Sequence, residues 1–190
     1  MPPWRPGVEA IVTFTGHAVL AVTPDIKDRR LVLLGVDGLG GAYDLRLMTA
    51  LAGPGGWIAS LGIFMAGRGG GHSDVPPRLA GRPGLATHPR AVFAARMRDQ
   101  PRVLGYADGR RSALAVIGRG IAGLTELSFE LQPGHRGKGS GTELVRYALT
   151  AIPPGQLVLA DVAPGNAAGV RALLLAGFIP LGSVQLFRRS

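Results

Sequence analysis

The sequence predicts a single domain of α/β (α+β) class, with a mixed central sheet flanked by helices and an elongated N-terminal half. Three observations support this prediction. The chain has 190 residues, of which 46% are hydrophobic, which is enough for one packed core. Its C-terminal half alternates strand-like and helix-like apolar patterns. A glycine-rich segment, LQPGHRGKGSGTEL at 131–144, joins one such strand to one such helix.

The N-terminal half contains several predicted elements but no functional motif. Residues 8–14 and 18–22 flank Thr15-Gly16-His17 and predict a hairpin. Further predictions are a third strand at 30–36, a helix at 42–51, an apolar run at 57–67 that fits a strand or a helix, and an irregular loop at 67–89. The second glycine-rich stretch, GVDGLGG at 35–41, lacks a basic residue and is predicted to be a turn.

The C-terminal half has a more regular order of elements. The predicted elements are a short helix at 90–98, strands near 102–107, 112–118 and 124–131, a helix at 142–151, a strand at 157–162, a helix at 167–176 and a final hairpin. Asn166 is a suitable N-cap for the last helix, and Gly177 followed by Phe178 predicts a Schellman stop.

The segment 131–144 has the properties of an anion-binding loop. A strand that ends in glycines and leads into a helix leaves backbone N–H groups unpaired beside the positive end of the helix dipole. The P-loop pattern fails, because Gln132 and Gly139 stand where glycine and Ser or Thr are needed. The dinucleotide pattern fails as well, because its third glycine would fall on Thr142 or Leu144.

A third pattern, [QR]-x-x-G-x-[GA], is met by Arg136, Gly139 and Gly141. Here the sequence resembles motif A of the GNAT superfamily of N-acetyltransferases. The segment 158–182, with Asn166 and Gly177-Phe178, resembles motif B of the same family. The resemblance covers about residues 100–190. It implies a GNAT fold, with an N-terminal α/β portion at 1–88 on the substrate side and an acetyl-CoA-binding core at 89–190.

The resemblance implies acetyl-CoA as acyl donor. Glycines of the loop would let the backbone approach the pyrophosphate, neighbouring amides would complete the anion site, and a backbone N–H at the end of the preceding strand would stabilise the thioester oxygen. The implied cofactor-binding residues are Leu131, Arg136, Gly137, Lys138, Gly139, Ser140, Gly141, Thr142 and Asn166.

Glu126 and Glu130 are the candidate catalytic residues. Transfer to an amine requires removal of its proton, which a carboxylate usually accepts. The two glutamates are four positions apart, so both leave the same face of a regular strand. In many relatives the acid stands one position earlier, where this chain has Thr125. The tyrosine that protonates the leaving thiolate in many relatives corresponds to Leu173.

Composition excludes several kinds of site. The chain has no cysteine, so disulfides, thiolate zinc sites, iron–sulfur clusters and an acetyl-cysteine intermediate are excluded. His17, His72, His88 and His135 are scattered without metal-ligand spacing, and no metal is expected.

The net charge is +9, and only Lys27 and Lys138 of the 21 basic residues are lysines. We interpret this charge as a basic surface, because no RRM, KH or helix-turn-helix signature indicates specific nucleic-acid binding. The start MPPWRPGVEA lacks the pattern of a secretory signal, and glycines and a proline interrupt the longest uncharged stretch, 47–67. A cytoplasmic location without membrane association is expected.

The sequence thus predicts an N-acetyltransferase that acts on a primary amine by direct attack in a ternary complex. A non-catalytic acyl-CoA sensor or scaffold module with the same fold is the alternative, and a basic RNA- or DNA-binding domain is a weaker one. The acceptor and the oligomeric state stay open, including a homodimer.

Overall fold

The computed structural model describes residues 1–71, 77–109 and 113–190. In these ranges the chain forms a mixed α+β fold around one ten-stranded sheet, which confirms the predicted fold class. The strands are β1 (Glu9–Phe14), β2 (His17–Ala21), β3 (Trp57–Ile58), β4 (Gly62–Arg68), β5 (Leu79–Gly81), β6 (Asp99–Tyr106), β7 (Ala113–Arg119), β8 (Thr125–Leu131), β9 (Leu157–Val162) and β10 (Ile179–Arg188). The helices are α1 (Asp28–Leu33), α2 (Leu45–Ala52), α3 (Pro89–Met97), α4 (Ser140–Thr150) and α5 (Ala167–Leu175).

The sheet has the order β2-β1-β10-β4-β9-β8-β7-β6-β5, and β3 pairs with β10. Among the described pairings, β8 and β9 are parallel and the others are antiparallel. A parallel pair needs a crossover, and α4 supplies it. The parallel pairing covers two positions, Thr125↔Val158 and Glu126↔Leu159.

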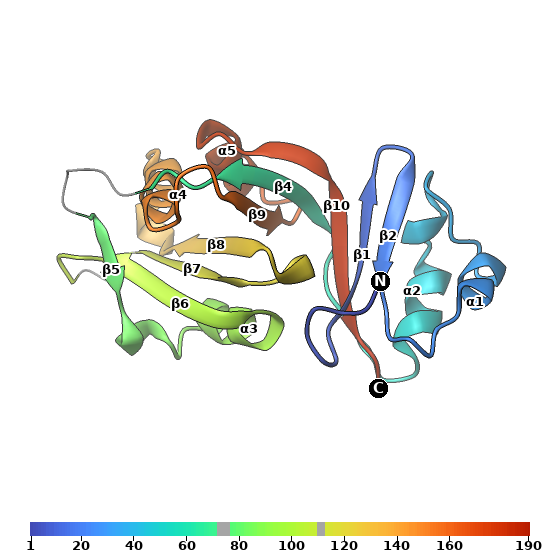
Figure 1. Cartoon of the computed structure of the whole chain (residues 1–190). Helices are drawn as coiled ribbons and strands as arrows, with labels where there is room; N and C mark the ends of the chain where they lie inside the picture. The colour runs from blue at the N-terminus through green and yellow to red at the C-terminus, as the bar shows by residue number, and fades with distance from the viewer. Residues whose placement is uncertain (72–76, 110–112) are drawn as a thin grey trace.

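Helices cover both faces of the sheet (Figure 1). On one face α4 and α5 bury Leu144, Val145 and Leu173 against alternate residues of β7, β8 and β9. On the other face α3 buries Ala91 and Ala94 against Leu114 and Val116 of β7. The helix α2 packs its buried residues against Ile11 of β1 and Phe187 of β10 at the other end of the sheet.

Two predicted elements are wrong. Residues 30–36 were expected as a strand, but α1 occupies Asp28–Leu33, where Leu31 and Leu34 pack inward at helical spacing while Val32 and Leu33 are exposed. The final hairpin is replaced by one ten-residue strand, β10, with a bulge between Pro180 and Gly182. A Cβ at Gly182 would collide with the Thr13 carbonyl of β1, so the glycine serves a close approach of strands.

Other predicted elements agree with the structure. The hairpin at 8–22, the helix at 42–51, the helix at 90–98 and the elements from 124 to 176 are confirmed within a few residues. The ambiguous run at 57–67 forms β3 and β4. The predicted loop at 67–89 contains the short strand β5. Residues 72–76 of this loop and residue 112, the first of the predicted strand 112–118, lie outside the described residues.

Candidate active site

The glycine-rich loop connects β8 to α4 through a short 3-10 turn at Pro133–His135. Gly137 and Gly139 have φ of +82° and +78°, a conformation that favours glycine, and Gly139 is the N-cap of α4 without a capping side chain. Within the described residues, no group accepts a hydrogen bond from the backbone N–H of Lys138, Ser140 or Gly141. These donors lie together at the positive end of a helix, which is the arrangement that binds anions.

The side chains of the loop have separate roles in the structure. The Arg136 Nε donates to the Leu131 carbonyl at 3.0 Å, so this guanidinium folds back onto the end of β8. Lys138 is exposed. A Cβ at Gly141 would lie 3.3 Å from the Cβ of Ala172, so a side chain there would crowd the contact between α4 and α5. Thr142 donates its backbone N–H to the Gly139 carbonyl at 3.0 Å.

The strands β8 and β9 separate below this loop. The strand β8 pairs with β7 from Thr125 to Leu131, but with β9 only at Thr125 and Glu126. Beyond Glu126 the edge of β8 that faces β9 has no strand partner among the described residues. This open edge ends at Leu131, next to the glycine-rich loop, and the backbone groups along it have no strand partner on the β9 side.

Asn166 caps α5 as predicted, because its Oδ1 accepts from the Gly169 N–H at 3.0 Å. The helix ends in a Schellman motif: Phe178 N–H donates to the Leu173 carbonyl and Gly177 N–H to the Leu174 carbonyl, each at 3.0 Å. The Leu173 side chain is 1% exposed and belongs to the core. An aliphatic side chain cannot donate a proton, so Leu173 cannot act as the general acid for a leaving thiolate.

The candidate base Glu126 lies in a buried ion pair. Its Oε2 accepts from the Arg98 Nε at 2.7 Å, and its Oε1 accepts from the Ile121 N–H at 2.6 Å. The side chains of Arg98 and Glu126 are 4% and 10% exposed. Arg98 also donates to the Ser128 Oγ at 2.9 Å, and its Nη2 lies 4.0 Å from Asp161 Oδ1 on β9. The guanidinium of Arg98 thus spans the opening between β8 and β9.

Glu130 lies on the same face of β8 as Glu126, as the spacing predicts. In the register of β7 and β8, Glu126 pairs with Gly118 and Glu130 with Leu114, both on the α3 side. The Glu130 Oε2 accepts from the Arg90 Nε at 3.0 Å, and these side chains are 35% and 39% exposed. Glu130 is therefore the more accessible carboxylate of the two.

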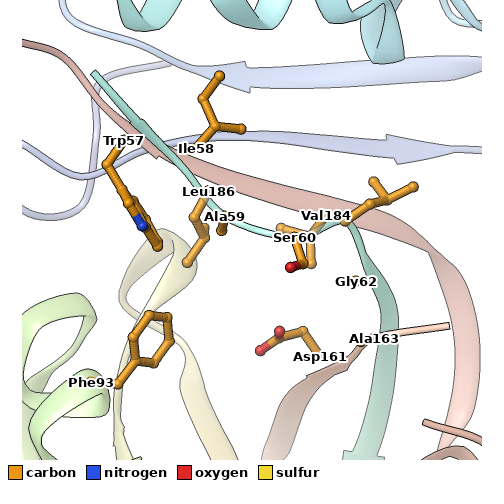
Figure 2. Close-up of a pocket in the computed structure, with 11 residues that line it drawn as sticks. Trp57, Ile58, Ala59, Ser60, Gly62, Phe93, Asp161, Ala163, Val184 and Leu186 are labelled. Atoms are coloured by element: carbon orange, nitrogen blue, oxygen red, sulfur yellow. The ribbon is translucent and has the colours of Figure 1, made fainter. Parts of the chain in front are cut away.

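A cavity of about 300 Å³ opens on this α3 face, and it was not predicted from the sequence. Its walls come from the segment before β4, from α3, from β10 and from the end of β9. Asp161, Trp57 and Phe93 line it (Figure 2). The one signal in the sequence is an acid inside the apolar strand LVLADV, which a pattern of alternation does not distinguish from a solvated position.

The clear pKa shifts belong to carboxylates away from this face. The Thr23 side chain and then the Arg189 guanidinium lower the pKa of Asp25 to about 2. The Arg46 side chain and backbone N–H lower the pKa of Asp44 to about 2. The backbone N–H groups of Leu39, Gly41 and Gly40 lower the pKa of Asp37. These three groups fix turns and helix ends.

No cluster of three or more His, Asp or Glu side chains in the described ranges is arranged to hold a metal ion. No helix in them has the length and apolar character needed to span a bilayer.

The comparisons with known proteins give similarity in structure only. No family model and no curated protein matches the sequence. Among solved structures, a GNAT-family protein of Novosphingobium aromaticivorans is 21% identical, with a TM-score of 0.49 over 72% of this chain and 69% of that chain. An acetyltransferase from the GNAT family of Colwellia psychrerythraea is 11% identical, with a TM-score of 0.49 over 96% and 81%. A GCN5-related N-acetyltransferase of Kribbella flavida is 15% identical, with a TM-score of 0.46 over 80% and 64%. At these values the similarity assigns neither a family nor an activity to this chain.

Proposed function

We propose that this chain is an N-acetyltransferase that uses acetyl-CoA to acetylate a primary amine by direct attack in a ternary complex. The observation that carries the proposal is the separation of the parallel strands β8 and β9 directly before a glycine-rich loop that opens α4. The open edge of β8 and the N-terminus of α4 lie next to each other. This arrangement suits a ligand that has both an amide-containing arm, which can pair with the strand edge, and a pyrophosphate, which can bind at the helix N-terminus.

The loop would hold the pyrophosphate through its unpaired backbone N–H groups at Lys138, Ser140 and Gly141, with the Lys138 ammonium adding charge. The edge of β8 up to Leu131 offers backbone groups to the amides of the arm and, at the thioester oxygen, a main-chain donor. Acetyl-CoA would supply a thioester whose carbonyl carbon accepts the lone pair of the amine and whose thiol leaves.

The attacking amine must lose a proton, and two carboxylates of β8 are candidates to accept it. Both oxygens of Glu126 are engaged by Arg98 and the Ile121 N–H, so protonation there would disrupt a buried ion pair. Glu130 shares one oxygen with Arg90 and is 35% exposed. In the proposal Glu130 therefore carries the larger share of the base function, and Glu126 holds Arg98 across the opening between β8 and β9.

A non-catalytic acyl-CoA-binding module is a second candidate function. It is favoured by the burial of Leu173, which leaves the usual position of the proton donor without a polar group, and by the engagement of Glu126. A free thiol has a pKa of about 8.5, so a thiolate can also leave without a protein donor, at a cost in rate. Turnover is the property that distinguishes the two functions.

The experiment is thiol release from acetyl-CoA in the presence of a panel of primary amines. We expect turnover with at least one amine, and Glu130→Gln to lower the rate by about 10²- to 10⁴-fold with unchanged CoA affinity. The loss should shrink as the pH approaches the pKa of the amine, about 10.4, because the acceptor then arrives neutral. CoA binding without turnover for any amine would support the binding module. Absence of CoA binding would refute both functions.

A further inference from the structure

We propose that the cavity bounded by Asp161, Trp57 and Phe93 is a binding site for a primary ammonium group carried on a small aromatic body, such as an arylalkylamine. Acetylation of this amine rests on the proposed function, but its binding does not. The guanidinium of Arg98 lies between this cavity and the opening between β8 and β9, with its Nη2 4.0 Å from Asp161 of the cavity and its Nε 2.7 Å from Glu126 of β8.

Asp161 supplies a carboxylate that the protein leaves largely without partners. The side chain is 47% exposed, and the nearest cation is Arg98 at 4.0 Å, whose Nε and Nη1 are already bonded to Glu126 and Ser128. Among the described residues, no hydrogen bond to the Asp161 carboxylate is formed. An ammonium group forms short, charge-assisted hydrogen bonds with such a carboxylate.

The backbone leaves room for this carboxylate at Gly62. A Cβ at Gly62 would lie 3.2 Å from the Asp161 Cβ and 3.3 Å from its Oδ2, which is closer than ordinary packing contacts. The segment before Gly62 is fixed to β10, because Ala59 N–H donates to the Leu186 carbonyl and Gln185 Nε2 donates to the Ala59 carbonyl, both at 2.9 Å. The wall opposite Phe93 is therefore held in place.

Two aromatic rings face the carboxylate. Trp57 and Phe93 come from β3 and α3, and their ring centroids are 6.1 Å apart at an interplanar angle of 60°. They are 38% and 42% exposed, although large apolar side chains are usually buried. Figure 2 shows the Asp161 carboxylate pointing from the end of β9 toward these rings. A cation between them and Asp161 would gain both ionic and cation–π attraction.

The size of the cavity selects a small ligand. A volume of about 300 Å³ is at the lower end of the range for small-molecule sites. The polar side-chain groups that line it are the Asp161 carboxylate, the Ser60 hydroxyl and the Trp57 indole N–H, and the other lining side chains are aliphatic or aromatic. A body of one ring and a short alkyl arm therefore fits better than an acidic or highly hydroxylated amine.

The test is binding of 2-phenylethylamine to the protein without acetyl-CoA, measured by calorimetry. We expect binding that weakens about 10- to 100-fold in Asp161→Asn, the usual range for a hydrogen bond to a charged group. Asp28→Asn, an exposed acid on α1, is the matched control and should leave binding unchanged. The Trp57→Ala variant should bind 2-phenylethylamine at least tenfold more weakly than the parent does. The parent should bind the uncharged analogue 2-phenylethanol at least tenfold more weakly than it binds the amine. Melting temperatures verify that each variant is folded.

Three outcomes would overturn the proposal: equal binding by Asp161→Asn and the parent, equal binding of 2-phenylethanol and 2-phenylethylamine, or no binding of the amine by the folded parent. None of these depends on CoA. Binding of 2-phenylethylamine without acetyl transfer to any amine would support this site and refute the enzyme. Acetyl transfer to other amines that does not depend on Asp161 would support the enzyme and refute this site.

Discussion

Replacing Glu126 with glutamine should lower stability strongly, because it leaves the buried guanidinium of Arg98 without its counter-charge. Removal of one partner from a buried ion pair costs about 3–5 kcal/mol. Arg98 is 4% exposed and its Nε lies 2.7 Å from Glu126 Oε2. The amide oxygen of glutamine can still accept from the Ile121 N–H, and Ser128 still accepts from Arg98. We therefore expect a loss at the lower end, about 3 kcal/mol.

In a chain of this length, 1 kcal/mol corresponds to about 2–4 °C in Tm. Glu126→Gln should consequently melt about 6–12 °C below the parent in thermal unfolding followed by circular dichroism. Glu130→Gln is the matched control, because its pair with Arg90 is more than a third exposed and should contribute about 1 kcal/mol or less. The double variant Arg98→Met/Glu126→Gln removes both charges and should lose less stability than the sum of the single variants. A Tm shift under 2 °C for Glu126→Gln, or strict additivity in the double variant, would refute the reasoning.

Three further predictions concern the surface. Lys138→Ala should weaken CoA binding severalfold, and the loss should be larger at low than at high salt, because the Lys138 ammonium is exposed and its charge is screened by salt. Equal CoA affinity of the variant and the parent at low salt would contradict this. The pKa of Asp44 is lowered to about 2 by Arg46, so between pH 4 and 2 this group binds fewer protons in the folded than in the unfolded protein. The free energy of unfolding therefore decreases as the pH is lowered from 4 to 2. Asp44→Asn, which can still cap α2, should flatten the dependence of Tm on pH there, and an unchanged slope would refute it. A random DNA duplex should bind only weakly at 150 mM salt, and sub-micromolar affinity in a gel-shift titration would instead favour a nucleic-acid-binding function.

The elements of the C-terminal half could be predicted from the sequence because short-range interactions define them. The Asn166 cap and the Schellman stop at Gly177 each involve residues within five positions of one another, whereas α4 begins at Ser140, two residues before its predicted start. The same is true of the common face of Glu126 and Glu130, which follows from the period of a strand.

Apart from α1, where a helical spacing was taken for a strand, the features that were missed depend on residues far apart in the chain. The strand β10 lies between β1 and β4, so its bulge at Gly182 is set by a contact with Thr13. Arg98 and Glu126 are 28 positions apart, and no local pattern connects them. The cavity joins residues of β3, α3 and β9, and periodicity describes each of these elements separately. These features could not be predicted from local sequence patterns, because contacts between distant parts of the chain determine them.

Calorimetric titration of CoA into the parent, Gly139→Glu and Gly155→Glu tests the central claim most directly. The two glycines have φ of +78° and +74°, and in both cases nothing lies within 4 Å of an added Cβ, so the backbone strain and the added charge are matched. Gly139 begins α4, whereas Gly155 follows its far end. If the loop holds the pyrophosphate of CoA, the parent and Gly155→Glu bind CoA with similar affinity and Gly139→Glu does not bind it. Equal affinity in the two folded variants, or no binding by the parent, would contradict the account.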